Sequence, residues 1–154
     1  MNIITFLESN HCPFECFPHE PTFSAERLAQ AIKVKGSEVA KTVLLRVGDG
    51  CRYAVAVLPA SKKLDLQAAS AVLGGAPVHL ATEFEIAERC PECEFGVLPP
   101  FGSRYGMQTI VDTSLAEDED IFFDAQTRCE AIRMTFDDYR ELEEPLIGRI
   151  AVNN

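Results

Sequence analysis

The sequence lacks several features that would assign it to a membrane or secreted class of protein. No apolar run approaches the roughly 20 residues that a membrane-spanning helix needs. The first residues, MNIITFLESN, have no basic stretch and include a glutamate, so they do not form a secretory signal. The six cysteines do not have the framework spacing of secreted disulfide proteins. These absences predict a cytoplasmic protein with reduced thiols and no membrane association.

Repeats, low-complexity tracts and linkers are also absent, so we expect residues 1–154 to form one domain. Positive charge is scarce, and the net charge of −10 argues against non-specific binding to nucleic acid, DNA included. Residues 26–63 are the exception, with eight Lys or Arg and three acidic residues. This basic segment is either an ordinary solvated face or a local surface for a phosphate-bearing ligand.

Local patterns predict helices and strands that are mixed along the chain. Helices are expected at 3–9, 25–34, 66–73, 83–90 and 136–144, and strands at 14–19, 41–47, 52–59, 77–81, 107–112, 120–125 and 129–135. The GDG at 48–50 predicts a hairpin. Many of these strands are joined by turns too short for crossover helices, which disfavours a parallel doubly wound sheet. We therefore predict an α+β fold with a curved, mostly antiparallel sheet flanked by helices.

Cysteine and histidine cluster in two stretches, which raises the question of a metal site. HCPFECFPH contains His11, Cys12, Cys16 and His19, and CPEC contains Cys90 and Cys93. A CxxC pair is typical of zinc sites only when a second pair has matching spacing, and a turn followed by a strand would not bring Cys12 and Cys16 together. A redox role for CPEC is the other alternative. We expect no metal, and cysteines that serve as small apolar residues.

Signatures of common enzyme classes are missing as well. There is no GxSxG elbow, no phosphate-binding loop and no dinucleotide fingerprint, and His79 lies in no recognisable motif.

Two features of the sequence remain as candidates for a functional site. Lys41 begins an apolar strand, so its ammonium either extends to the rim of the sheet or is aimed at a phosphate or a developing oxyanion. The stretch FGVLPPFG at 95–102 places two prolines between two glycines, and is either a buried corner or a loop shaped against a ligand.

Three segments in order, HEPTFSAERLAQAIKVKGSEVAKTVLLR, YAVAVLPASKKLDLQAAS and GVLPPFG, resemble the YbaK/prolyl-tRNA synthetase-associated editing-domain family over about residues 19–144. Members are aminoacyl-tRNA deacylases, and their mixed sheet curls into a partial barrel. The resemblance implies a trans-editing hydrolase, without a cofactor, that acts on the 3′ end of a mischarged tRNA carrying Ala, Cys, Ser or Thr. The alternative is a non-catalytic module of the same fold that binds tRNA ends or a partner protein. The oligomeric state is left open.

The resemblance also assigns roles by position. Lys41 matches the essential lysine of the family, and Gly96, Pro100, Phe101 and Gly102 match its GxxxPFG loop. Two positions depart from the pattern of many members. Thr42 stands where some have Asn, and FFDAQT, with Asp124 and Thr127, stands where many have F-H/N-x-x-T. Both positions lie near the place where the family holds the aminoacyl group, so the identity of the amino acid stays open.

The expected chemistry needs no strong nucleophile, because an aminoacyl-tRNA is already an activated ester. Hydrolysis requires a positioned water and ester, and rejection of the correct amino acid. Lys41 would anchor the 3′-terminal nucleotide, and Gly96 would let the backbone approach the ester. Pro99 and Pro100 would fix the directions of the remaining amides and carbonyls. We therefore expect the backbone of 95–102 to form the catalytic surface, with a structural corner as the alternative.

Overall fold

Ten strands and six α-helices form in residues 2–154, the part of the chain that the computed structural model describes. The helices are α1 (Ile3–Ser9), α2 (Ala25–Ala31), α3 (Leu66–Val72), α4 (Glu83–Arg89), α5 (Thr113–Ala116) and α6 (Phe136–Glu143), with a 3₁₀ turn η1 (Gly102–Tyr105). The strands are β1 (Glu15–Pro18), β2 (Ala40–Val47), β3 (Arg52–Pro59), β4 (Lys62–Leu64), β5 (Val78–Leu80), β6 (Gln108–Asp112), β7 (Asp120–Asp124), β8 (Glu130–Thr135), β9 (Leu146–Gly148) and β10 (Ala151–Asn153).

Helix starts follow the capping residues of the sequence. The side chains of Ser24, Asp65, Thr82 and Thr135 accept hydrogen bonds from first-turn amides, and Thr82 forms a capping box with Glu85. The end of α2 differs from the expectation. The helix ends at Ala31 and not at residue 34, because Lys33 adopts the left-handed conformation with φ 59°.

The strands form three sheets and not the single curved sheet that we expected. Their orders are β5–β2–β3–β6–β9, β1–β8–β7 and β10–β4. In residues 2–154, β6 pairs in parallel with β3 and β9, and the other five strand pairs are antiparallel. Strongly twisted sheets with many strands tend to split in this way, and here one bridge between Val39 and Phe122 connects the two larger sheets. The prediction of an α+β fold with mixed, mostly antiparallel pairing is confirmed.

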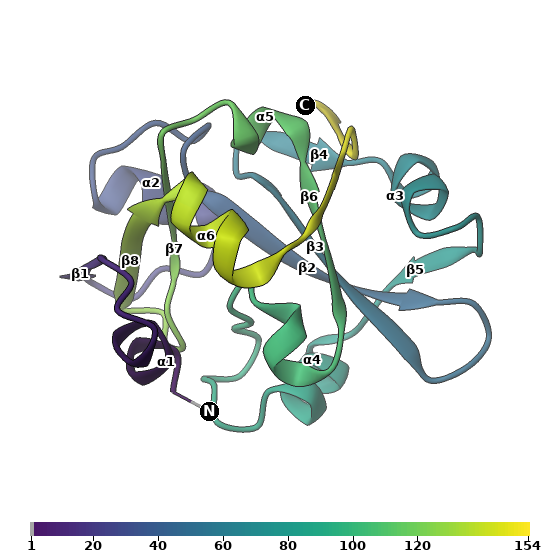
Figure 1. Cartoon of the computed structure of the whole chain (residues 1–154), viewed down its shortest axis with the longest axis horizontal. Coiled ribbons are helices and arrows are strands. Elements are labelled where there is room, and N and C mark those ends of the chain that lie inside the picture. The colour runs from purple at the N-terminus through teal and green to yellow at the C-terminus, as the bar shows by residue number, and fades with distance from the viewer. Residues whose placement is uncertain (1) are drawn as a thin grey trace.

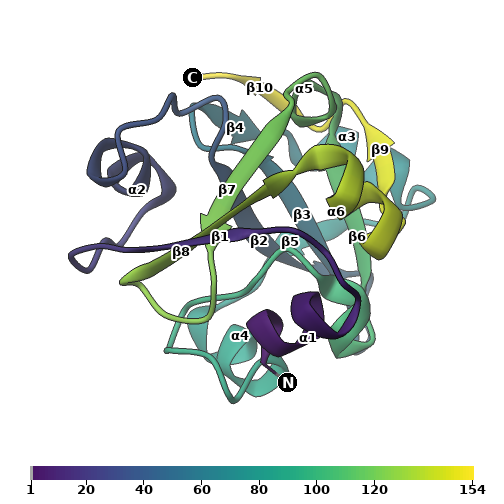
Figure 2. The same ribbon diagram turned by 60° about the vertical axis from the view of Figure 1, so that its left-hand side comes forward.

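The two larger sheets share one hydrophobic core. In Figure 2 the β1–β8–β7 sheet crosses over β2 and β3, and Figure 1 shows α6 lying across the front of the molecule. Leu44 and Val55 from the larger sheet pack in the same core as Phe123 from the smaller one. Their strand neighbours Leu45 and Ala54 point to the opposite face, where α3 packs. Burial on both faces explains why β2 and β3 are apolar almost throughout.

The last strands depend on one buried carboxylate. Asp112 Oδ1 accepts hydrogen bonds from the amides of Ile150 and Ala151, each at 2.9 Å, and the same side chain caps α5. These contacts place the C-terminal strand β10 beside β4. No helix in residues 2–154 is long and apolar enough to cross a membrane.

Candidate functional site

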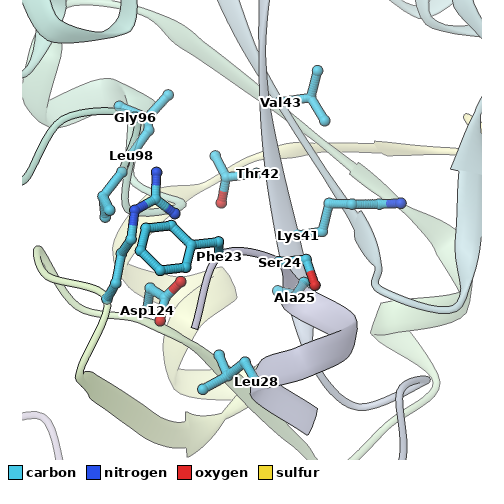
Figure 3. A pocket seen from close by; sticks show the side chains of 13 residues that line it. Phe23, Ser24, Ala25, Leu28, Lys41, Thr42, Val43, Gly96, Leu98 and Asp124 are labelled. Atoms are coloured by element: carbon cyan, nitrogen blue, oxygen red, sulfur yellow. The ribbon is translucent and has the colours of Figure 1, made fainter. Parts of the chain in front are cut away.

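A cleft of about 250 Å³ lies where four segments of the chain meet (Figure 3). They are the start of α2, the start of β2, the loop before η1 and the end of β7. The residues that line it are Phe23, Ser24, Ala25, Leu28, Ala40, Lys41, Thr42, Val43, Gly96, Val97, Leu98, Asp124 and Arg128. Four of the nine predicted site residues therefore lie together: Lys41, Thr42, Gly96 and Asp124.

Lys41 and Thr42 are neighbours on β2, so their side chains leave opposite faces of the strand. Figure 3 shows Thr42 on the side of Gly96 and Asp124, whereas Lys41 extends away from them. The Lys41 ammonium donates to the carbonyl oxygen of Lys62 at 2.6 Å. Burial lowers the pKa of Lys41, and the nearby Glu26 carboxylate opposes that shift. An ammonium has three N–H donors, so this contact leaves donors for a ligand at the edge of the cleft.

Gly96 forms a tight turn that only glycine accommodates well. The amide of Val97 donates to the carbonyl of Glu94 at 2.9 Å, and Gly96 has φ 84°, as expected for the third residue of a type II turn. A Cβ at Gly96 would lie 2.5 Å from Arg128 Nη2 and 3.3 Å from Glu83 Oε2. The backbone of Gly96 is thus exposed to the cleft in a conformation and a space that exclude a side chain.

Asp124 ends β7 with its carboxyl group inside the cleft. Within residues 2–154, its Oδ1 atom is buried and has no hydrogen-bond partner. Burial raises the pKa of Asp124 to about 6, although the nearby His19 and Arg128 act to lower it. A buried carboxylate oxygen without a partner is costly, and it is an acceptor for a donor group supplied by a ligand.

The loop at 95–102 divides into two halves with different surroundings. We call residues 95–98 the cleft half and residues 99–102 the core half. Gly96, Val97 and Leu98 of the cleft half line the cleft, whereas no residue of the core half does. The predicted direct roles of Pro99, Pro100, Phe101 and Gly102 at the substrate therefore have no support from their positions.

The core half is held by buried side chains. The Pro100 carbonyl accepts a hydrogen bond from Tyr139 Oη at 2.6 Å, and Phe101 is fully buried with its ring 5.2 Å from that of Tyr139. The Gly102 amide donates to Thr109 Oγ1 at 3.0 Å. Glu143 accepts from the Thr109 hydroxyl at 2.5 Å, and burial raises the pKa of this carboxyl group. The corner alternative therefore applies to residues 99–102.

Thr127 does not line the cleft, and its hydroxyl lies 3.6 Å from Cys129 Sγ. The sequence interpretation missed Phe23 and Arg128, which do line it. Arg128 Nη2 donates to the Phe95 carbonyl at 3.0 Å, and its guanidinium lies 4.9 Å from the centre of the Phe23 ring. Phe23 immediately precedes the cap Ser24, and this position next to a predicted helix start was the available signal.

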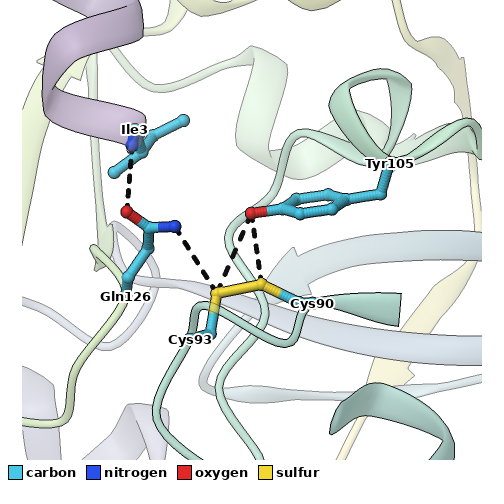
Figure 4. Close-up of a disulfide and its surroundings, with 5 residues drawn as sticks. All are labelled: Ile3, Cys90, Cys93, Tyr105 and Gln126. Carbon is cyan, nitrogen blue, oxygen red and sulfur yellow. Dashed lines mark hydrogen bonds between the residues drawn. A yellow bond between two sulfur atoms is a disulfide. The ribbon is translucent and has the colours of Figure 1, made fainter. Parts of the chain in front are cut away.

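The CPEC stretch contains a disulfide, so the expectation of six reduced thiols is wrong for Cys90 and Cys93. The turn after α4 brings their Cα atoms to 5.6 Å, within the usual range for this bond. Figure 4 shows Tyr105 and Gln126 around it. Tyr105 Oη lies 3.1 Å from Cys90 Sγ, and the Gln126 side chain links Cys93 to the first amide of α1, that of Ile3.

Potential metal ligands come together at one place in residues 2–154. The ligand atoms of Cys90, Glu92 and Cys93 lie within 4.8 Å of one another, but the two sulfur atoms are bonded to each other and not available as thiolates. Cys12 and Cys16 are free and do not join this group. His19 Nδ1 lies 2.7 Å from the Glu20 carbonyl, and His79 is exposed on β5.

Comparison with known proteins adds to this geometry. A family model described as aminoacyl-tRNA editing domain matches residues 19–142. The Multifunctional Ser/Thr-tRNA deacylase ProXp-y of Escherichia coli (strain K12) is 25% identical over 146 residues, which cover 93% of this chain and 87% of that protein.

Two solved structures have a similar fold. The crystal structure of hypothetical protein APE2540 superposes with a TM-score of 0.87 at 18% identity, covering 97% of this chain and 99% of the other. A candidate trans-editing enzyme for prolyl-tRNA synthetase gives a TM-score of 0.82 at 19% identity, covering 98% and 95% of the two chains.

Proposed function

Because the chain belongs to the aminoacyl-tRNA editing domain family, we propose that it hydrolyses the ester of a mischarged tRNA that carries a small amino acid. Residues 1–154 would act as one editing domain. The observation that carries the proposal is the meeting of Lys41, Thr42, Gly96 and Asp124 in one cleft, although they come from three separate segments.

The α-ammonium group of the aminoacyl moiety is the ligand group that fits Asp124. It supplies donors to the partnerless, buried Oδ1 atom and a positive charge to the carboxylate. With its pKa raised to about 6, Asp124 is mostly ionised at pH 7, and pairing with the ammonium would strengthen that state. The exposed backbone of Gly96 would then lie at the ester, where dipoles fixed by the turn stabilise developing charge.

Thr42 and Lys41 would contact different parts of the substrate. The Thr42 side chain lies on the same side of β2 as Asp124 and is placed to contact the aminoacyl side chain. Lys41 is at the edge of the cleft, and its long flexible stem would let the ammonium engage the terminal phosphate or ribose. Water is the nucleophile, and the cleft acts by positioning it and the ester.

The named function of a relative favours a small amino acid. The cleft volume of about 250 Å³ is enough for an aminoacyl group. The Escherichia coli relative is named for action on Ser- and Thr-tRNA. We therefore propose Ser, Thr, Ala and Cys as the class of amino acids removed.

A panel of tRNAs charged with these amino acids, and with larger ones as controls, tests the function directly. We expect hydrolysis of at least one small aminoacyl ester. Lys41→Ala should reduce the rate on the best substrate by about 100- to 1000-fold, as for loss of a well-placed charge contact. Lys63→Ala, at an exposed lysine on β4, is the matched control and should keep the wild-type rate.

The non-catalytic alternative makes the opposite prediction. A module that only holds tRNA ends would bind charged tRNA and leave every ester in the panel intact. Wild-type rates in a folded Lys41→Ala protein would instead identify Lys41 as an ordinary rim lysine.

A further inference from the structure

Three phenylalanine rings are exposed at the rim of the cleft. Phe23, Phe84 and Phe95 are 77%, 73% and 48% exposed, respectively. Soluble proteins rarely expose several large apolar side chains in one place. Where they do, the exposed patch usually marks a binding surface. The function proposed above uses none of these rings.

The rings form a continuous rim through Arg128 and the Gly96 turn. Phe84 and Phe95 contact each other edge to face, with ring centres 5.4 Å apart. Arg128 lies 4.9 Å from the centre of the Phe23 ring and donates to the Phe95 carbonyl. We call Phe23, Phe84 and Phe95 the aromatic rim. Since Phe23 and Arg128 also line the cleft, the rim is continuous with it.

The dimensions of the cleft favour such a surface next to it. Pockets that bury most of a drug-sized ligand have volumes of about 300–1,000 Å³. This cleft has about 250 Å³, which suits an aminoacyl group and leaves the nucleotides outside. On the proposed function, the unpaired nucleotides that carry the ester would then lie against the rim of the cleft.

The charges at the rim favour contacts with bases and not with phosphates. Arg128 is paired with Glu94 at 3.6 Å, and Glu83 lies close to the Gly96 turn on the same side. Two carboxylates beside one guanidinium would repel a phosphate. Nucleobase faces are uncharged and stack on aromatic rings and guanidinium planes, as in proteins that bind single-stranded nucleic acid.

We infer that the aromatic rim is a stacking platform for the unpaired 3′-terminal nucleotides of the tRNA. The inference rests on the proposed function for the choice of ligand. It can nevertheless be tested without hydrolysis, because an uncharged RNA presents the same bases.

The test compares two uncharged RNA hairpins with the same stem, one blunt-ended and one with an unpaired 3′ tail that ends in CCA. Fluorescence anisotropy would measure the binding of each hairpin. We expect wild type to prefer the tailed hairpin, and Phe84→Leu or Phe95→Leu to weaken its binding by about 5- to 100-fold. Binding of the blunt hairpin should not change. Phe95→Trp, which keeps an aromatic face, should keep the wild-type preference for the tailed hairpin.

Val152→Ala is the control, because Val152 is an exposed apolar residue on β10 that lines no part of the cleft. It should bind both hairpins as wild type does. Equal binding of the two hairpins by wild type, or an unchanged preference in a folded Phe84→Leu, Phe95→Leu double variant, would overturn the inference. Ring-dependent binding of the tail in a protein that hydrolyses no ester would support the platform and contradict the proposed function.

Discussion

The two halves of the loop at 95–102 each contain one glycine, and the two glycines are required for different reasons. Gly96 in the cleft half has a positive φ and exposes its backbone to the cleft. Gly102 in the core half is required for space, since a Cβ there would lie 2.6 Å from Thr109 Oγ1 and 2.9 Å from Val55 Cγ2. Residues of one motif can therefore face the cleft and the core separately. Substitutions in the two halves should separate rate from stability.

The largest effect on stability should come from Phe101→Ala in the core half. Phe101 is fully buried among the rings of Phe6, Phe123 and Tyr139, and removing a buried phenyl ring typically costs about 3–5 kcal/mol. Denaturant unfolding would measure the change, and Phe95→Ala in the cleft half is the control, with a change below about 1 kcal/mol. A Phe101→Ala protein of wild-type stability would show that the corner is not a packing feature.

Two carboxyl groups, the buried one of Glu143 and the half-buried one of Asp124, extend the comparison, because each lies beside one half of the loop. Glu143 beside the core half accepts three hydrogen bonds from Ser103 and Thr109, whereas Asp124 beside the cleft half has a partnerless Oδ1. The pKa of Asp124 is raised from 3.8 to about 6, so the fold favours its neutral form. The neutral Asp124 carboxyl group therefore contributes to the free energy of unfolding. This contribution is fully present below about pH 4 and is lost as the pH rises through 6.

Asp124→Asn should therefore become more stable relative to wild type between pH 4 and pH 7, by up to about 3 kcal/mol. Denaturant unfolding at pH 4, 5, 6 and 7 would measure the difference, and the comparison with wild type removes the titration of other groups. On the proposed function, the wild-type kcat/KM should fall below pH 6, and the variant should lose both rate and this pH dependence. A stability difference independent of pH would contradict the assigned titration.

Gly96→Ala and Gly102→Ala test the halves directly. Gly102→Ala should lower the free energy of unfolding by about 1–3 kcal/mol through overpacking, with little change in rate where the protein is folded. Gly96→Ala should cost about 1–2 kcal/mol from the strained φ, and the displaced Arg128 and the added methyl should slow turnover on all substrates. Paired measurement of melts and deacylation rates separates the two outcomes. If both variants lose deacylation rate in proportion to their loss of stability, the two halves of the loop do not have separate roles.

Most of the fold could be predicted from local patterns, because the capping residues and apolar periods act over a few residues. The hairpin of β2 and β3 and the capping box at Thr82 are examples. The short strands β4, β9 and β10 could not be predicted, since β10 pairs with β4 and is held by Asp112, and both contacts are distant in sequence. The division into three sheets depends on the same long-range contacts.

The resemblance to the family predicted several of the residues that line the cleft. It could not predict which residues of the same motif are buried in the core. Lys41, Thr42, Gly96 and Asp124 do meet in the cleft. The motif could not distinguish them from Pro100 or Phe101, because a conformationally restricted stretch looks the same whether it faces a ligand or the core. Burial by Tyr139 and other rings, which depends on distant segments, makes that distinction.

Tyr139→Phe is the smallest change and the most selective one for the core half. The hydroxyl of Tyr139 donates to the Pro100 carbonyl at 2.6 Å, and the ring packs against Phe101 and Phe136. Phenylalanine keeps those ring contacts and leaves the buried carbonyl without its donor, which should cost about 1–2 kcal/mol. At this chain length, the melting temperature should fall by about 2–8 °C. If the core half only supports the loop, deacylation rates and the discrimination between Ser and Thr should match wild type at temperatures where both proteins are folded. A change in discrimination without a change in melting temperature would instead place the Pro100 carbonyl within the catalytic surface.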